Sequence, residues 1–192
     1  MEGYAYFPAV VYRDERPDLV EKVLPAAMKH LDKVRNSIWA VLQSDHVNGD
    51  PDMRDLADYL LWNSVDILRT QGYNVEKYDF YLSGLWVQEL QKGAGTNVHV
   101  HKNSQICGWV FLETPLGCAY PLYHDTRMNK GMVELDFVQG EEITNATGMI
   151  QFNNVIPGTV LFSNSWMNHQ LVGGNSDTPT RCIHFIVSHK NR

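Results

Sequence analysis

Three histidines have a spacing that could hold a metal ion. His99 and His101 alternate with valines in the run Asn97-Val98-His99-Val100-His101. Successive side chains of a β-strand point to opposite faces, so both imidazoles would lie on one face. His169 follows a Pro-Gly turn, a short strand and a loop that we expect to carry it. Distant strands of a closed antiparallel barrel can face each other, so the three imidazoles could share one ion.

The donor set does not identify the metal, because three histidines suit zinc, copper, iron or nickel. Two histidines and one carboxylate would favour ferrous iron. Asp125 is the best candidate for that carboxylate if His99 lies outside the coordination sphere. A turn residue that bonds its own backbone explains Asp125 equally well. A single strand histidine can also be a hydrogen-bonded structural residue, so the alternatives for the third ligand stay open.

Arg181 begins the last apolar run of the chain, twelve residues after His169. Its side chain would share a strand face with Ile183 and Phe185, which we expect to be the inner face of a barrel. An arginine there needs an anionic partner, and its planar fork can clasp a carboxylate with two hydrogen bonds. A dicarboxylate cosubstrate would be such a partner. Solvent at the strand mouth, or an acidic residue of the chain, is the alternative.

The remaining chain predicts two helices followed by a β-rich region. A short strand over Tyr6–Tyr12 precedes helical apolar spacing from Asp18 to Leu42, and a second helix spans Asp52–Thr70. From Tyr78 onward, short apolar runs alternate with turn residues. The predicted strands are Tyr81–Leu90, Val98–His101, Gln105–Leu112, Tyr120–His124, Met132–Phe137, Met149–Phe152, Thr159–Ser163, Gln170–Val172 and Cys182–Ser188.

These elements predict a single mainly β domain over residues 1–192, a jelly roll of the double-stranded β-helix or cupin kind. Residues 1–75 would supply the first strand and two helices that cover one outer face, and residues 78–188 the jelly-roll core. The length of 192 residues is enough for a substantial core and a buried site.

Composition excludes several classes of function. With 44% apolar and 20% charged residues the chain is typical of a globular domain. A net charge of -6 argues against nucleic acid as a partner, which would need clustered Lys and Arg. No apolar stretch reaches membrane-spanning length and the N-terminus lacks a signal peptide, so we expect a cytoplasmic protein with reduced cysteines. The oligomeric state, monomer or homodimer, stays open.

The chain resembles the ferrous-iron and 2-oxoglutarate dependent oxygenases, specifically the small members frequent in phages and marine bacteria. The similar stretch runs from about Tyr78 to Ser188. Its matching elements, in order, are Gly84-Leu85-Trp86, His99-Val100-His101-Lys102-Asn103-Ser104, Cys107-Gly108-Trp109-Val110-Phe111-Leu112, Tyr123-His124-Asp125-Thr126-Arg127, Pro157-Gly158-Thr159-Val160-Leu161-Phe162, Ser165-Trp166-Met167-Asn168-His169 and Arg181. Several motifs in the right order are more specific than any one of them.

The resemblance implies metal ligands from the second and seventh barrel strands and a cosubstrate arginine from the eighth. It assigns His99 or His101 as the first ligand, His169 as the distal ligand and Arg181 as the residue that binds the side carboxylate of 2-oxoglutarate. The common pattern is His-x-Asp or His-x-Glu, whereas His101 stands at the acidic position here. The site would therefore use three histidines or recruit Asp125.

The implied cofactors are Fe(II) and 2-oxoglutarate, whose decarboxylation to succinate would drive oxidation of a substrate C–H bond. Asn103 is a candidate beside the cosubstrate, and Gln105, Trp109 and Arg127 are candidates for the pocket wall. For each of these four, packing or surface hydrogen bonding is the alternative explanation.

Two other functions compete with this prediction. A metal-dependent cupin enzyme that does not use 2-oxoglutarate, such as an isomerase or thiol dioxygenase, suits the His-x-His pair but does not explain Arg181. A non-catalytic jelly-roll binding protein would leave the arginine and the three histidines unrelated. The substrate is not indicated by the sequence.

Overall fold

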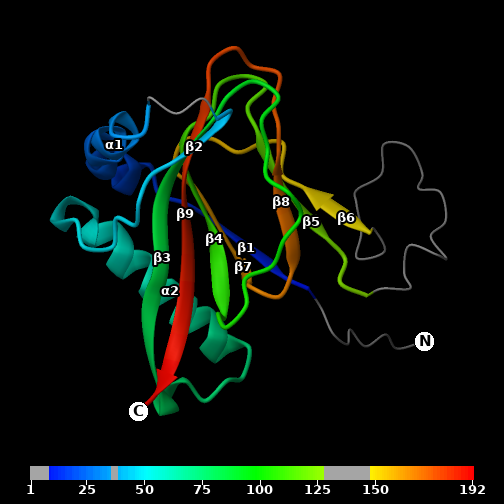
Figure 1. Ribbon diagram of the computed structural model, residues 1–192. Helices are drawn as coiled ribbons and strands as arrows, with labels where there is room; N and C mark the ends of the chain where they lie inside the picture. The colour runs from blue at the N-terminus through cyan, green and yellow to red at the C-terminus, as the bar shows by residue number, and fades with distance from the viewer. Residues whose placement is uncertain (1–8, 36–38, 128–147) are drawn as a thin grey trace.

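The computed structural model describes residues 9–35, 39–127 and 148–192. In these residues, two antiparallel sheets face each other: a larger sheet ordered β1-β7-β4-β9-β3-β2 and a smaller one ordered β6-β5-β8 (Figure 1). The strands are β1 (Val11–Glu15), β2 (Val41–Gln43), β3 (Tyr78–Leu90), β4 (Ile106–Glu113), β5 (Tyr120–His124), β6 (Met149–Gln151), β7 (Thr159–Asn164), β8 (Asn168–Val172) and β9 (Thr180–Asn191). Among the described residues, no helix has the length and apolar character needed to cross a membrane.

Two helices cover one face of the larger sheet, as expected. Helix α1 (Pro17–Asp32) begins with a proline, whose missing N–H costs nothing at that position, and α2 (Arg54–Thr70) follows a single 3-10 turn over Pro51–Met53. The Asp50 side chain accepts a hydrogen bond from the backbone N–H of Asp52 at 2.9 Å and caps that turn. Figure 1 shows both helices on the side of the larger sheet away from β5 and β8.

The prediction that the first helix continues to Leu42 is wrong. Helix α1 ends at Asp32, and Val41–Gln43 instead forms β2, an edge strand paired with β3. Hydrogen bonds to β3 and burial of Leu42 outweigh the helical spacing of the apolar residues.

The strand period of two divides the apolar residues into two clusters. One lies between the larger sheet and the helices, and β9 contributes Ile183, Phe185 and Val187 to it. The other lies between the two sheets and contains Trp109, Phe111, Tyr123, Leu161, Leu171 and Cys182. The barrel interior is therefore this second region. The face of β9 that carries Cys182 points into it.

Most predicted strands are present with shifted ends, but three predictions need comment. The first described strand is Val11–Glu15; the strand predicted over Tyr6–Tyr12 overlaps it at Val11 and Tyr12, and its residues 6–8 lie outside the described residues. Val98–His101 is not a strand; it is joined to β8 only through an isolated bridge between His99 and His169. The predicted strand Met132–Phe137 lies outside the described residues.

Candidate metal centre

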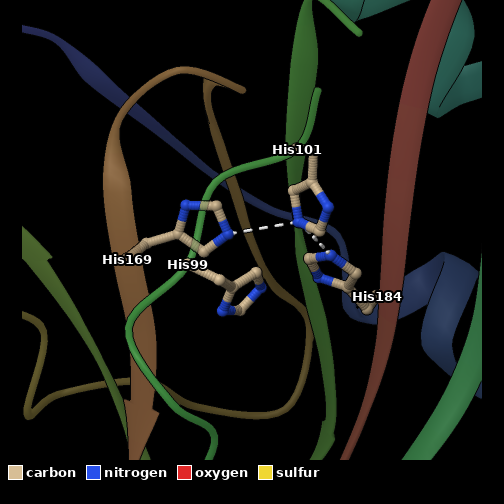
Figure 2. A group of neighbouring side chains, drawn as sticks. All are labelled: His99, His101, His169 and His184. Atoms are coloured by element: carbon tan, nitrogen blue, oxygen red, sulfur yellow. Dashed lines mark hydrogen bonds between the residues drawn. The ribbon is translucent and has the colours of Figure 1, made fainter. Parts of the chain in front are cut away.

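Four histidine side chains converge between the two sheets. One ligand nitrogen from each of His99, His101, His169 and His184 lies within 4.8 Å of the others. Figure 2 shows the four rings, with His169 reaching in from β8, His184 from β9, and the other two from the segment that precedes β4. Metal–nitrogen bonds of about 2.0–2.1 Å would place nitrogens on opposite sides of an ion roughly 4 Å apart. The set needs only small side-chain rotations to share one ion.

Paired backbone hydrogen bonds hold His99 beside His169. The N–H of His99 donates to the carbonyl of His169 at 3.0 Å, and the N–H of His169 donates back at 3.1 Å. The flanking Val98 and Val100 side chains are 49% and 39% exposed, so the alternation of faces predicted for this segment is present. This bridge places both imidazoles at the same depth of the barrel.

Hydrogen bonds also fix which ring nitrogen of two histidines faces inward. Nδ1 of His169 lies 2.7 Å from the carbonyl oxygen of Met167, and Nδ1 of His99 lies 2.7 Å from that of Asn97. A carbonyl can only accept, so each Nδ1 carries the proton and each Nε2 presents a lone pair. This is the arrangement that orients a metal-binding imidazole.

The remaining contacts leave more nitrogen lone pairs than protons. Nε2 of His101 lies 3.2 Å from Nε2 of His169 and 3.0 Å from Nε2 of His184. One proton on His101 can satisfy only one of these two contacts. A metal ion would accept lone pairs from all the nitrogens at once, so the donor set fits a cation.

Burial keeps His101, His169 and His184 neutral, which is the form that binds a metal. Burial, and secondarily the charge of His99, lowers the pKa of His101 to about 4. Burial lowers the pKa of His169 to about 3, and it lowers that of His184 well below its ordinary value. The centre is thus preorganised for coordination at neutral pH.

The sequence does not predict His184 as a member of the site. It also predicts that the strand near His169 begins at Gln170, whereas β8 begins at Asn168. His169 lies inside β8, whereas a loop was expected to carry it. His184 lies on β9 and is only 2% exposed. A histidine within a continuous apolar strand was the available signal, because a buried polar side chain needs a partner.

Aromatic side chains surround the histidines. The ring of Trp109, a predicted wall residue, lies 5.3 Å from the rings of both His169 and His184. Trp86 packs against the outer side of His184 at 4.8 Å. The Tyr123 ring lies 6.1 Å from His169. These contacts fix the imidazoles and keep water away from the inner side of the centre.

Asp125 is not brought into the histidine group. Its carboxylate accepts hydrogen bonds from the guanidinium of Arg127 and from the Arg127 backbone N–H, the latter at 2.8 Å. Asp125 therefore bonds the backbone of its own turn, which was the alternative to a role as metal ligand. Of the two candidates for the third ligand, the structure places His99 with His101 and His169.

Arg181 does lie on the strand face of Ile183 and Phe185, but the expectation that this is the inner face is wrong. That face packs against the helices, while His184 occupies the opposite face of β9. The Arg181 guanidinium pairs with Glu89 at 2.6 Å and with Glu113. An acidic partner within the chain was the alternative considered for this arginine.

The other two candidates lie in the turn between His101 and β4. Asn103 has a positive φ of 59°, and its carbonyl accepts a hydrogen bond from the Ser188 hydroxyl at 3.1 Å. Gln105 lines a cavity of about 250 Å³ that opens beside Tyr78 and Trp166. Both residues therefore shape the turn that follows His101.

Comparison with known proteins identifies a family. The family model described as "Putative 2OG-Fe(II) oxygenase" matches residues 84–185, more than half of the chain. This span contains all four histidines of the candidate metal centre. No curated protein matches the sequence.

Solved structures share the fold at low sequence identity. The epimerase SnoN of nogalamycin biosynthesis, a non-haem α-ketoglutarate dependent protein, aligns with a TM-score of 0.68 at 13% identity, covering 96% of this chain and 79% of its own. A viral collagen prolyl hydroxylase from Paramecium bursaria Chlorella virus-1 gives 0.60 at 12%, covering 92% and 94%. A prolyl-4-hydroxylase from Pseudomonas putida gives 0.58 at 10%, covering 96% and 94%. The two facing sheets are thus a double-stranded β-helix.

Proposed function

This chain belongs to the 2OG-Fe(II) oxygenase family. From that premise we propose that it is an oxygenase that depends on Fe(II) and 2-oxoglutarate, and that His99, His101 and His169 hold the iron. The inward lone pairs on Nε2 of His99 and His169 carry this proposal. His101 belongs to the same group, because its Nε2 lies 3.2 Å from Nε2 of His169.

The donor set supports iron without identifying it, because imidazoles also bind zinc, copper and nickel. A bound iron would activate dioxygen, the oxidant, for attack on a substrate C–H bond, and 2-oxoglutarate would supply two electrons as it is oxidised to succinate and carbon dioxide. The chain's own contribution is positional. The hydrogen bonds to Met167 and Asn97 orient two imidazoles, and the packing of Trp109 excludes water from the inner side of the site.

The test is cofactor turnover by the purified protein. With ferrous iron, ascorbate and oxygen, we expect 2-oxoglutarate to be converted to succinate slowly even without a prime substrate. Anaerobic titration with ferrous iron should show one tight site per chain. Tight iron binding with neither succinate formation nor binding of 2-oxoglutarate would contradict the oxygenase.

One observation favours a second candidate, a metal-dependent cupin-type enzyme that uses no 2-oxoglutarate. The histidine group includes no carboxylate among the described residues, and Arg181 is paired with Glu89 and Glu113 rather than directed at the centre. Metal-loaded protein that binds a thiol or a sugar acid, and does not bind 2-oxoglutarate, would favour this candidate.

We also propose that the protein works in a reducing cytoplasm. Its three cysteines, Cys107, Cys118 and Cys182, are free thiols, and unpaired buried cysteines are typical of reducing compartments. Thiol titration of protein isolated without a reductant should give three thiols per chain.

A further inference from the structure

A cavity of about 250 Å³ lies at the end of the larger sheet where β9 finishes, and it is separate from the metal centre. Its walls include Phe80 near the start of β3, His189 near the end of β9 and Leu68 of α2. Side chains alternate between the faces of a strand, so His189 lies on the helix-covered face of β9 with Val187, opposite the face of His184. None of the described lining residues belongs to the metal centre. The cavity is therefore a second recess outside the barrel interior.

Aromatic rings make up much of the cavity wall. The rings of Tyr78 and His189 lie 4.7 Å apart and nearly perpendicular, and Phe80 lies 6.2 Å from each of them. Tyr73 and Trp166 line the same cavity but are 59% and 50% exposed, and neither makes a ring contact with another residue that the structure describes. Aromatic rings pair with their centroids about 4.5–7 Å apart, so these two exposed rings can take a planar partner.

Two polar atoms of the wall lack hydrogen-bond partners. Oε1 of Gln105 and Nδ1 of His189 are both buried, and neither is paired with a described residue. By contrast, the amides of Asn164 and Gln71 bond each other at 3.0 Å in both directions, and the Ser104 hydroxyl donates to a backbone carbonyl. An amide oxygen can only accept a hydrogen bond. Since a buried polar group without a partner is unfavourable, a ligand in this cavity should carry a donor for Gln105.

Charge decides which kind of donor fits. The described wall of the cavity contains no Asp, Glu, Lys or Arg. Aromatic walls also suit alkylated ammonium ions, but Lys77, Lys102 and Lys190 are exposed close to the wall residues in the chain and would repel a cation. Asp79, the acidic residue between two wall residues of β3, already pairs with Arg192 at 2.8 Å. An anion would be buried without a cationic partner in the wall. The fitting ligand is therefore neutral.

We propose that this cavity binds a neutral planar heteroaromatic group that carries an N–H donor and is the size of one indole ring. The ring would lie against Trp166 and Tyr73 and donate its N–H to Gln105. The volume is just below the roughly 300–1,000 Å³ of sites for drug-sized ligands, which suits a single ring system. A water molecule could pair with Gln105, but it would leave both exposed aromatic rings without a partner.

Indole is the probe for this site, and 1-methylindole is its matched control because it keeps both rings and lacks the N–H. The full chain is titrated with each, followed by calorimetry and by ligand-observed NMR. We expect indole to bind with a dissociation constant of about 1 mM or below. 1-Methylindole should bind about fivefold more weakly, as for loss of one neutral hydrogen bond. Tetramethylammonium, the cationic probe, should bind more weakly than indole.

Variants test the two contacts separately. Gln105→Met keeps the length of the side chain and removes its amide, so indole and 1-methylindole should bind this variant within about twofold of each other. A merely structural role of Gln105 would leave their ratio unchanged. Trp166→Ala removes a stacking surface and should weaken indole binding about tenfold. Trp62→Ala is the matched control, because Trp62 is 67% exposed on α2, does not line the cavity and should leave binding unchanged. Melting curves confirm that each variant is folded.

Three results would overturn the assignment. The first is no binding of indole to the wild type up to about 10 mM. The second is a folded Gln105→Met protein that prefers indole as strongly as the wild type does, or a folded Trp166→Ala protein with unchanged indole affinity. The third is tighter binding of tetramethylammonium than of indole. Iron and 2-oxoglutarate take no part in these titrations, so failure of the proposed function would leave this test intact.

Discussion

The Nε2 atoms of His101 and His184 lie 3.0 Å apart although 83 positions separate the two residues in the chain. This contact brings β9 into a centre that otherwise consists of β8 and the segment before β4. It also means that coordination need not stop at three imidazoles, since His184 presents a fourth nitrogen to the same point.

His169 should be indispensable for metal binding. His169→Ala removes the imidazole whose tautomer is fixed by Met167, and we expect the affinity for ferrous iron or cobalt to fall more than about 100-fold. Calorimetric titration measures it. His46→Ala is the matched control, because His46 is exposed and lies outside the centre. Metal affinity retained by a folded His169→Ala protein would contradict the site.

His184 should modulate the centre without being required for it. In His184→Phe the ring still packs between Trp86 and Trp109 but offers no nitrogen. If His184 coordinates, the visible spectrum of cobalt-substituted protein should change and metal affinity should fall by roughly tenfold to 100-fold. An identical cobalt spectrum in the variant would show that His184 stays outside the coordination sphere.

Metal binding should persist to a lower pH than histidine's ordinary pKa of 6.5 suggests. Protons compete with the metal only where the imidazoles become charged, and burial lowers the pKa of His101 to about 4 and of His169 to about 3. We expect His101 and His169 to keep their bonds to the metal from neutral pH to about pH 5 and to lose them as the pH drops through 4. A steep loss that begins near pH 6.5 in folded protein would contradict this.

Arg181 should matter for stability. Arg181→Met leaves the Glu89 carboxylate, 2% exposed, with only Arg35 as a cationic partner. Removing one member of a buried ion pair costs about 3–5 kcal/mol, and we expect about 3 kcal/mol here because Arg35 remains. Urea unfolding measures it. Adding Glu89→Gln to the variant should restore much of the loss, whereas an unchanged or larger loss in the double variant would show that the pair is not the cause.

The thiols should differ in reactivity. Burial raises the pKa of Cys107 to about 12 and raises that of Cys182 as well, so neither presents a thiolate near neutral pH. Cys118 is only partly buried, and we expect it to react first with an alkylating reagent. Mass spectrometry of briefly labelled native protein identifies the modified residue. Labelling of Cys107 before Cys118 would contradict the described burial.

The sequence predicts much of the centre because its signals are local. Two residues separated by one position in an extended segment must share a face, which brings His99 and His101 together. His169 follows from the order of motifs along the barrel strands. The antiparallel sheets and the covering helices follow from the change of apolar period near Tyr78.

The sequence could not predict in the same way which side chains of β9 point into the barrel. Both of its faces are buried, and residues such as Cys182, Ile183, His184 and Phe185 are all at most 2% exposed. A strand buried on both faces lacks the alternation of apolar and polar residues that marks an inner side. Arg181 was therefore assigned to the interior and His184 was overlooked. The end of the first helix was missed for a related reason, since pairing of β2 with β3 is a contact distant in sequence.

A bound ion would cross-link the two sheets. His169 belongs to the smaller sheet and His184 to the larger, and His101 contacts both across 68 and 83 positions of the chain. Such a cross-link stabilises the folded chain by an amount that grows with the logarithm of free metal, about 2.7 kcal/mol at 100 times the dissociation constant. The supply of iron in a cell would then govern how long each molecule survives proteolysis, as well as whether it can react.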